Sequence, residues 1–190
     1  DLHKIGWQPA SASVLLLADA DSFAPFSCSV PYLNPHDDEQ AGFGGLLGYT
    51  LQTTRRPDAV KVATSLIAHG KSGLGAMLQT CHALAKYAEA LIRAETRFEL
   101  IAAVSLTTVV FRYISRESDF VNSELRRRLI VDGRAVVGRT TVGSTDIDAS
   151  RTCLKLTLLN PLASEASIQN LFDDILDMAT KIEESMLNEI

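Results

Sequence analysis

The residues best suited to covalent chemistry lie near the beginning of the sequence, where His3 and Lys4 are adjacent in a polar turn. An apolar run at residues 14–17 follows, and it predicts a short buried strand over residues 13–18. A lysine held between a turn and a buried strand can lose solvation, which favours its neutral amine. That amine can attack a carbonyl carbon and form a Schiff base. Lys4 is therefore a candidate for carbonyl chemistry, the alternative being an ordinary surface lysine at a turn.

The composition indicates a globular protein that binds something small. The chain has 190 residues, of which 46% are hydrophobic and 22% charged, enough for one sizeable core or for part of a larger domain plus a small one. A net charge of -5 offers no attraction for nucleic acid or anionic lipid. No apolar run approaches the roughly 20 residues that span a bilayer. We expect a small-molecule partner or a second copy of the chain, and neither nucleic acid nor a membrane.

The cysteines argue against a metal site and against secretion. Cys28, Cys81 and Cys153 are odd in number and widely spaced, and no Cys/His cluster suggests a metal ligand set. A disulfide framework of the secreted type does not fit this pattern, and no secretory signal opens the chain. The sequence therefore favours a reducing cytoplasm and no metal.

The residues between the first strand and the first helix form a long predicted loop. Residues 19–55 have no clear periodicity and are rich in Pro, Gly, Asp and Asn. Their glycines supply the backbone freedom that a moving lid needs, the alternative being disorder without function: Gly42, Gly44, Gly45 and Gly48.

The rest of the chain predicts linking helices followed by a small α+β layer. A helix over about 57–69 should end at Gly70, and an apolar stripe predicts a longer helix over about 74–92. We place a domain boundary near residue 96. Beyond it, the sequence predicts strands within 98–113, a helix from Ser118 or Asp119 to Gly133, strands over 135–141 and 152–159, and a terminal helix capped by Ser164, with the helices on one face of the sheet.

Four stretches resemble one enzyme family in the same order. The run DLHKIGWQP is similar to the pyridoxal-phosphate lysine segment of the group II amino-acid decarboxylases, which have fold-type I. The other stretches are Pro31-Tyr32-Leu33, Thr53-Thr54-Arg55-Arg56 with Asp58 and Lys61, and Arg97-Phe98-Glu99-Leu100. The resemblance covers nearly the whole chain but only the carboxy-terminal part of such an enzyme, so we expect a piece of a longer polypeptide. It implies an α/β fold with the end of the large cofactor domain at 1–96 and the small α+β domain at 97–190.

The resemblance also implies a site. Lys4 would hold pyridoxal 5'-phosphate covalently, and His3 would hydrogen-bond its phosphate, although a structural histidine is an equal alternative. Tyr32 would lie on a flexible loop that closes over the active site of the partner subunit, where it returns a proton to the α-carbon. The complete enzyme would then be a homodimer. Some family members have an arginine that binds the substrate carboxylate where this chain has Lys155, and a lysine cannot make the same bidentate contact.

The implied activity is decarboxylation of an amino acid. Residues 6–9 and 52–56 look closest to family members that convert L-2,4-diaminobutyrate to 1,3-diaminopropane and carbon dioxide. Glutamate and aromatic amino acids are alternative substrates. An alternative of another class is a catalytically inactive piece that serves as a dimerisation or structural unit, because other cofactor-binding residues of the family lie upstream.

Overall fold

The computed structural model describes residues 1–27, 32–33, 35–43, 45, 52, 54–143 and 150–188. The chain divides into two compact units, Asp1–Gly70 and Lys71–Ile190. The boundary predicted near residue 96 lies inside the second unit, because the carboxy-terminal part of the helix before it packs into the core of that unit. How the complete enzyme divides into domains stays a prediction.

The first unit has short helical segments and little core. It contains the 3-10 helix η1 (Ala20–Phe26), α1 (His36–Gln40) and the beginning of α2 (Asp58–Ala94). Two of its described residues are buried, Gln8 and Ala12. The long loop predicted over 19–55 thus includes η1 and α1, while its Gly44, Gly48 and Cys28 lie outside the described residues. Its role as a lid stays a prediction.

The buried strand predicted over residues 13–18 is wrong. These residues form no strand, and the apolar side chains at 14–17 are all exposed, Leu16 to 84%. The physical reason is that a strand needs a neighbour for its backbone hydrogen bonds, and no described residue pairs with this run. Apolar composition alone therefore did not produce a strand here.

Helix α2 confirms the predicted break between two helices. Its backbone leaves the helical conformation at Gly70, where φ is 62° and ψ is 179°. Glycine adopts that conformation far more readily than any residue with a side chain. Beyond the break, the predicted apolar stripe faces the core of the second unit, with these members buried: Cys81, Leu84, Ala85, Ala88 and Ile92.

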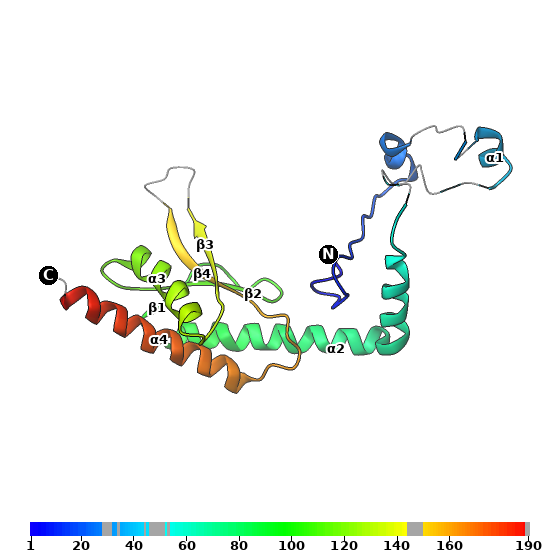
Figure 1. Cartoon of the computed structure of the whole chain (residues 1–190). Coiled ribbons are helices and arrows are strands. Elements are labelled where there is room, and N and C mark those ends of the chain that lie inside the picture. The colour runs from blue at the N-terminus through cyan, green and yellow to red at the C-terminus, as the bar shows by residue number, and fades with distance from the viewer. Residues whose placement is uncertain are drawn as a thin grey trace. The chain divides into compact units, whose positions relative to one another are not determined.

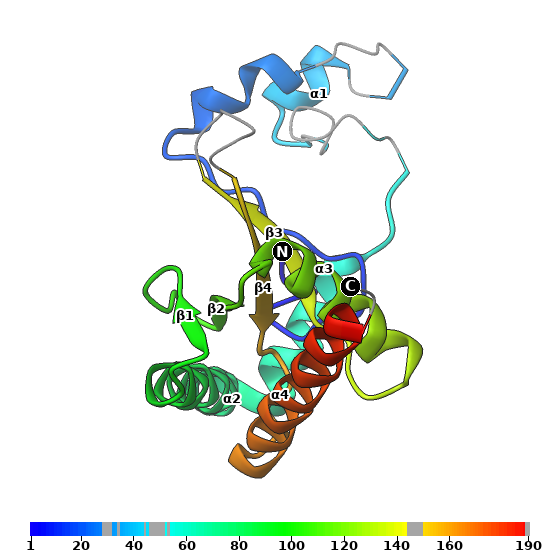
Figure 2. The same cartoon turned by 90° about the vertical axis from the view of Figure 1, so that its left-hand side faces the viewer.

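The second unit is built on a four-stranded antiparallel sheet formed by described residues, with strand order β1-β2-β4-β3 (Figures 1 and 2). Its elements in chain order are β1 (Phe98–Leu100), β2 (Thr108–Tyr113), α3 (Ser118–Val131), β3 (Gly138–Val142), β4 (Arg151–Thr157) and α4 (Glu165–Asn188). The predicted cap of the last helix is confirmed, because Ser164 Oγ accepts a hydrogen bond from the Ser167 N–H at 3.2 Å. The sequence thus predicted this α+β layer in outline.

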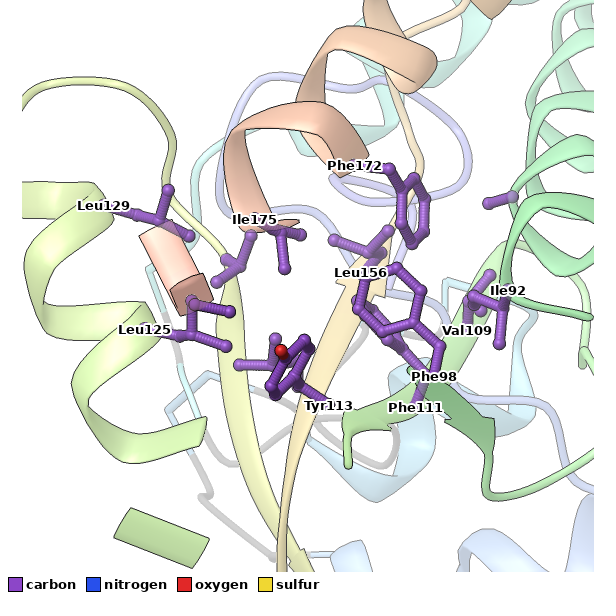
Figure 3. Close-up of a cluster of buried hydrophobic side chains, with 14 of the residues drawn as sticks. Ile92, Phe98, Val109, Phe111, Tyr113, Leu125, Leu129, Leu156, Phe172 and Ile175 are labelled. Atoms are coloured by element: carbon purple, nitrogen blue, oxygen red, sulfur yellow. The ribbon is translucent and has the colours of Figure 1, made fainter. Parts of the chain in front are cut away.

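One face of the sheet forms the core with the helices. In the β2–β4 register Val109 pairs with Leu156 and Phe111 with Leu154, so these four side chains share a face. Figure 3 shows Val109, Phe111 and Leu156 beside side chains from α2, α3 and α4. The Phe172 ring from α4 lies 5.5 Å from the Phe98 ring and 5.3 Å from the Phe111 ring, centroid to centroid. Such close aromatic pairs add to the stability that burial supplies.

The other face of the sheet combines charged and polar side chains with the buried Cys153. Lys155 and Thr157 are exposed there, as the alternation along β4 predicts. Arg112 Nη2 donates to Asp119 Oδ1 at 3.1 Å, and Arg151 Nη1 donates to Glu99 Oε1 at 3.1 Å. Among the described residues, no helix combines the length and the apolar composition needed to cross a bilayer.

Candidate active site

A closed turn at the beginning of the chain holds His3 and Lys4. Backbone hydrogen bonds close it, from Lys4 N–H to the Asp1 carbonyl at 3.2 Å and from Gln8 N–H to the Leu2 carbonyl at 3.0 Å. A Cβ atom placed on Gly6 would lie 2.8 Å from the Leu2 carbonyl oxygen. Because that distance is too short for a carbon atom, this turn requires glycine at position 6.

Lys4 has an accessible, ion-paired amine. Its Nζ lies 2.6 Å from Asp1 Oδ2, and its side chain is 62% exposed. The desolvation expected from a neighbouring buried strand is not observed, because residues 14–17 are themselves exposed. What the turn provides is a primary amine in a defined place that a small molecule can reach.

His3 is held in place by hydrogen bonds to Ala12. Its backbone N–H donates to the Ala12 carbonyl at 3.1 Å. Its Nδ1 lies 2.9 Å from that carbonyl oxygen and 3.3 Å from the Ala12 nitrogen. Nδ1 can donate to the Ala12 carbonyl only in the tautomer that has its proton on Nδ1. It can accept from the Ala12 N–H only in the tautomer that has its proton on Nε2. In the second arrangement Nε2 carries the proton and can donate it to an anionic oxygen.

The third predicted site residue is Tyr32, whose side chain is 81% exposed in a turn. No contact between it and His3 or Lys4 is described. Its neighbour Pro31 lies outside the described residues. The structure therefore brings His3 and Lys4 together, and the role of Tyr32 stays a prediction.

Two basic residues near the beginning of α2 have partners within the first unit. Arg56 Nη2 donates to Ser11 Oγ at 3.3 Å, and Lys61 Nζ lies 2.7 Å from Asp58 Oδ1. The hydrogen bond from Lys61 lowers the pKa of Asp58 below its ordinary value. The anionic partner of Lys61 is thus Asp58. Thr53, part of the same predicted motif, lies outside the described residues.

The two described thiols are unsuited to nucleophilic chemistry. Cys81 and Cys153 are both fully buried. Burial raises the pKa of each thiol, which disfavours the reactive thiolate. The nucleophile of interest is therefore the lysine amine.

Sequence reasoning missed Asp1. Its carboxylate contacts Lys4 and also accepts a hydrogen bond from Ser13 Oγ at 2.7 Å. The available signal was the spacing, since an acid three residues before a lysine in a turn can reach its ammonium group.

Comparison with known proteins assigns the family. The model of the pyridoxal-dependent decarboxylase conserved domain matches residues 2–114, which include His3, Lys4 and Gly6 of the closed turn and all of α2, β1 and β2. The chain belongs to this family. The predicted family is thereby confirmed, and so is its dependence on a pyridoxal cofactor.

Curated relatives extend the match over nearly all of the chain. An L-2,4-diaminobutyrate decarboxylase of Rhizobium meliloti (strain 1021) is 35% identical over an alignment of 191 positions, which covers 96% of this chain and 37% of that protein. One from Acinetobacter baumannii is 28% identical, over 98% of this chain and 36% of that protein. The chain thus spans little more than a third of the length of these relatives.

Solved structures confirm the predicted fold class. The glutamate decarboxylase domain of a Vibrio parahaemolyticus diaminobutyrate-pyruvate transaminase and L-2,4-diaminobutyrate decarboxylase is 32% identical, with a TM-score of 0.61 over 72% of this chain and 28% of that chain. Oryza sativa TDC, solved with PLP and tryptamine, has a TM-score of 0.73 over 84% of this chain and 33% of that chain. At 23% identity the second likeness shows the fold alone.

The residues of the closed turn fit a pyridoxal cofactor. Such a group carries an aldehyde, which a primary amine can join, and a phosphate, which an N–H donor can bind. Lys4 offers an exposed amine, and the neighbouring His3 offers a ring nitrogen that the Ala12 contacts leave free of the backbone. The donor set therefore matches the two ends of the cofactor.

Proposed function

We propose that this chain is the carboxy-terminal part of a pyridoxal-phosphate-dependent carboxy-lyase that decarboxylates L-2,4-diaminobutyrate to 1,3-diaminopropane and carbon dioxide. The observation that carries the proposal is the exposed Lys4 amine, held beside His3, and both residues lie within the family match. The substrate rests on similarity to relatives named L-2,4-diaminobutyrate decarboxylase. Glutamate and aromatic amino acids are the alternative substrates.

When bound, pyridoxal phosphate supplies an aldehyde carbon for an amine and a ring that accepts the electrons released when a carbon–carbon bond breaks. Lys4 Nζ would hold the cofactor through its aldehyde carbon, with the aldehyde oxygen lost as water, and the amine of the substrate would displace it. Lys4 would take the cofactor back as the product amine leaves. These steps need a nucleophilic amine that solvent and substrate can reach, which the exposure of Lys4 permits.

His3 binds the cofactor, and Tyr32 protonates the substrate. His3 Nε2 donates a hydrogen bond to the cofactor phosphate, in the tautomer in which Nδ1 accepts from the Ala12 N–H. Tyr32, from the partner subunit of a homodimer, gives a proton from its phenol to the α-carbon of the substrate after carbon dioxide leaves. We propose that this enzyme acts in the cytoplasm.

The site is tested by trapping the cofactor on the protein. The whole polypeptide is incubated with pyridoxal phosphate, reduced with borohydride and mapped by peptide mass spectrometry. The expected label is on Lys4, and the label should disappear in Lys4→Ala. A label on Lys61 or Lys71 instead would overturn the assignment. A panel of L-2,4-diaminobutyrate, glutamate and aromatic amino acids, with carbon dioxide release as the readout, then tests the substrate.

A second candidate is a piece that is inactive alone and serves as a dimerisation or structural unit. Its support is the small core of the first unit, in which Gln8 and Ala12 are the buried residues among those described. A turn with so little buried around it depends on other parts of the enzyme for rigidity. We expect residues 1–190 alone to show negligible turnover and the whole polypeptide to decarboxylate. Turnover by residues 1–190 alone would contradict this second candidate.

A further inference from the structure

The Asp1 carboxylate lies at the centre of the closed turn. One oxygen, Oδ2, lies 2.6 Å from Lys4 Nζ and 3.8 Å from His3 Nε2. The other, Oδ1, accepts a hydrogen bond from Ser13 Oγ at 2.7 Å. The backbone carbonyl of Asp1 accepts a further hydrogen bond from the Lys4 N–H at 3.2 Å. A single residue thus contacts both candidate cofactor residues.

This arrangement restrains the lysine twice. The backbone hydrogen bond fixes where the Lys4 side chain begins, and the carboxylate fixes where its ammonium group ends. Ser13 in turn orients the carboxylate from the far side of the turn. A long, flexible side chain otherwise samples many rotamers, so the two attachments reduce the entropy it must lose before it reacts.

We propose that Asp1 is a positioning residue, whose carboxylate holds the Lys4 ammonium group while no cofactor is bound and releases it when the amine reacts with the cofactor. This inference rests on the proposed function, which assigns Lys4 to the cofactor. An ammonium group has no lone pair, so the ion pair must separate and the proton must leave before Nζ can bond to carbon. Asp1 therefore keeps the lysine in place at the cost of some reactivity.

The expected size of this effect is modest because both partners are partly exposed. The side chain of Lys4 is 62% exposed and that of Asp1 is 39% exposed. Exposed ion pairs of this kind change an equilibrium by at most about fivefold. We therefore expect removal of the carboxylate to raise the reactivity of the Lys4 amine by about two- to fivefold.

The experiment measures the amine directly, without the cofactor. The whole polypeptide, free of cofactor, is treated near neutral pH with the uncharged acylating reagent N-hydroxysuccinimide acetate. Mass spectrometry gives the acylation rate of Lys4 relative to that of Lys71. In Asp1→Asn the relative rate should rise by about two- to fivefold, and Asp1→Glu should restore it towards the original value. Asp21→Asn is the matched control, because Asp21 has no described partner and should leave the rate unchanged.

Salt separates an ion pair from a structural effect. Raising the ionic strength to about 1 M shortens the Debye length to about 3 Å, which weakens an exposed pair. The Lys4 rate should therefore rise with salt in the original protein and change little in Asp1→Asn. The inference is overturned if Asp1→Asn matches Asp21→Asn, if Asp1→Glu does not restore the rate, or if salt has no effect on the original protein. Borohydride labelling of Lys4 tests the proposed function separately, so a labelled Lys4 with an unchanged Asp1→Asn rate would refute this inference alone.

Discussion

Replacing Asn122 should destabilise the second unit more than any exposed substitution in its helices. The β2–β4 register ends at the pair Phe111–Leu154, and the amide of Asn122 then takes the place of a strand partner for Tyr113. Its oxygen accepts from the Tyr113 N–H at 2.9 Å, and its nitrogen donates to the Tyr113 carbonyl at 2.8 Å. Asn122 itself is fully buried on α3. The perturbation is Asn122→Ala.

The magnitude follows from the two backbone groups of Tyr113 that lose their partner. A buried group left without a hydrogen bond costs about 1–3 kcal/mol, so two such groups cost about 2–6 kcal/mol. Alanine regains about 0.5 kcal/mol because it is the better helix former. We therefore expect Asn122→Ala to lower the free energy of unfolding by about 2–5 kcal/mol.

Urea unfolding of residues 1–190, followed by circular dichroism, measures this loss. Asn170→Ala makes the same chemical change at an exposed position of α4, and we expect it to alter the free energy by no more than about 0.5 kcal/mol. Asn122→Asp separates the two hydrogen bonds, since a carboxylate can accept from the Tyr113 N–H but cannot donate to its carbonyl. A loss below about 1 kcal/mol in Asn122→Ala, or equal losses in the two alanine variants, would refute the reasoning.

Three further predictions concern the site, a carboxylate and the helix break. Lys4→Arg keeps the charge but loses the nucleophilic amine, so carbon dioxide release by the whole polypeptide should fall about a thousandfold or more; a fall under tenfold would contradict the role of Lys4. Hydrogen bonds from Arg97 lower the pKa of Glu95 to about 2 from 4.5. The resulting stability is present above pH 4.5 and lost as the pH falls towards 2. Glu95→Gln should therefore lower the free energy of unfolding by about 1 kcal/mol at most above pH 4.5, and this difference should vanish as the pH falls towards 2. Gly70→Ala should lower the free energy of unfolding by about 1–3 kcal/mol because Gly70 has a positive φ. Gly75→Ala should raise the free energy of unfolding by up to about 1 kcal/mol. Equal increases of the thermal unfolding temperature in the two variants would show that no strain exists at Gly70.

Local sequence patterns were enough to predict most of the helices and strands of the second unit. The spacing of apolar residues in α2 and α4, and the alternation of Leu154 and Leu156 with Lys155, follow from the geometry of one helix or one strand. Ser164 and Gly70 act on the backbone within a few residues of themselves. Such features depend on neighbours in sequence, which is why the sequence was enough to predict them.

The first unit contains features that local sequence patterns did not predict. Residues 14–17 have the composition of a buried strand, but strand formation needs hydrogen-bond partners from elsewhere, and no described residue supplies them. The residue types predicted the polar turn that holds His3 and Lys4, which the structure shows, but the contacts of Asp1 with Lys4 and Ser13 were not predicted.

The sequence by itself determined the family, the order of the helices and strands in the second unit, and the candidate lysine. Tertiary structure alone decided that Asn122 completes the end of β2, that the Lys4 amine is exposed, and that Asp1 binds it. The physical reason is range: periodicity and capping act over one turn or one strand, whereas burial and side-chain hydrogen bonds depend on which distant residues the fold brings together.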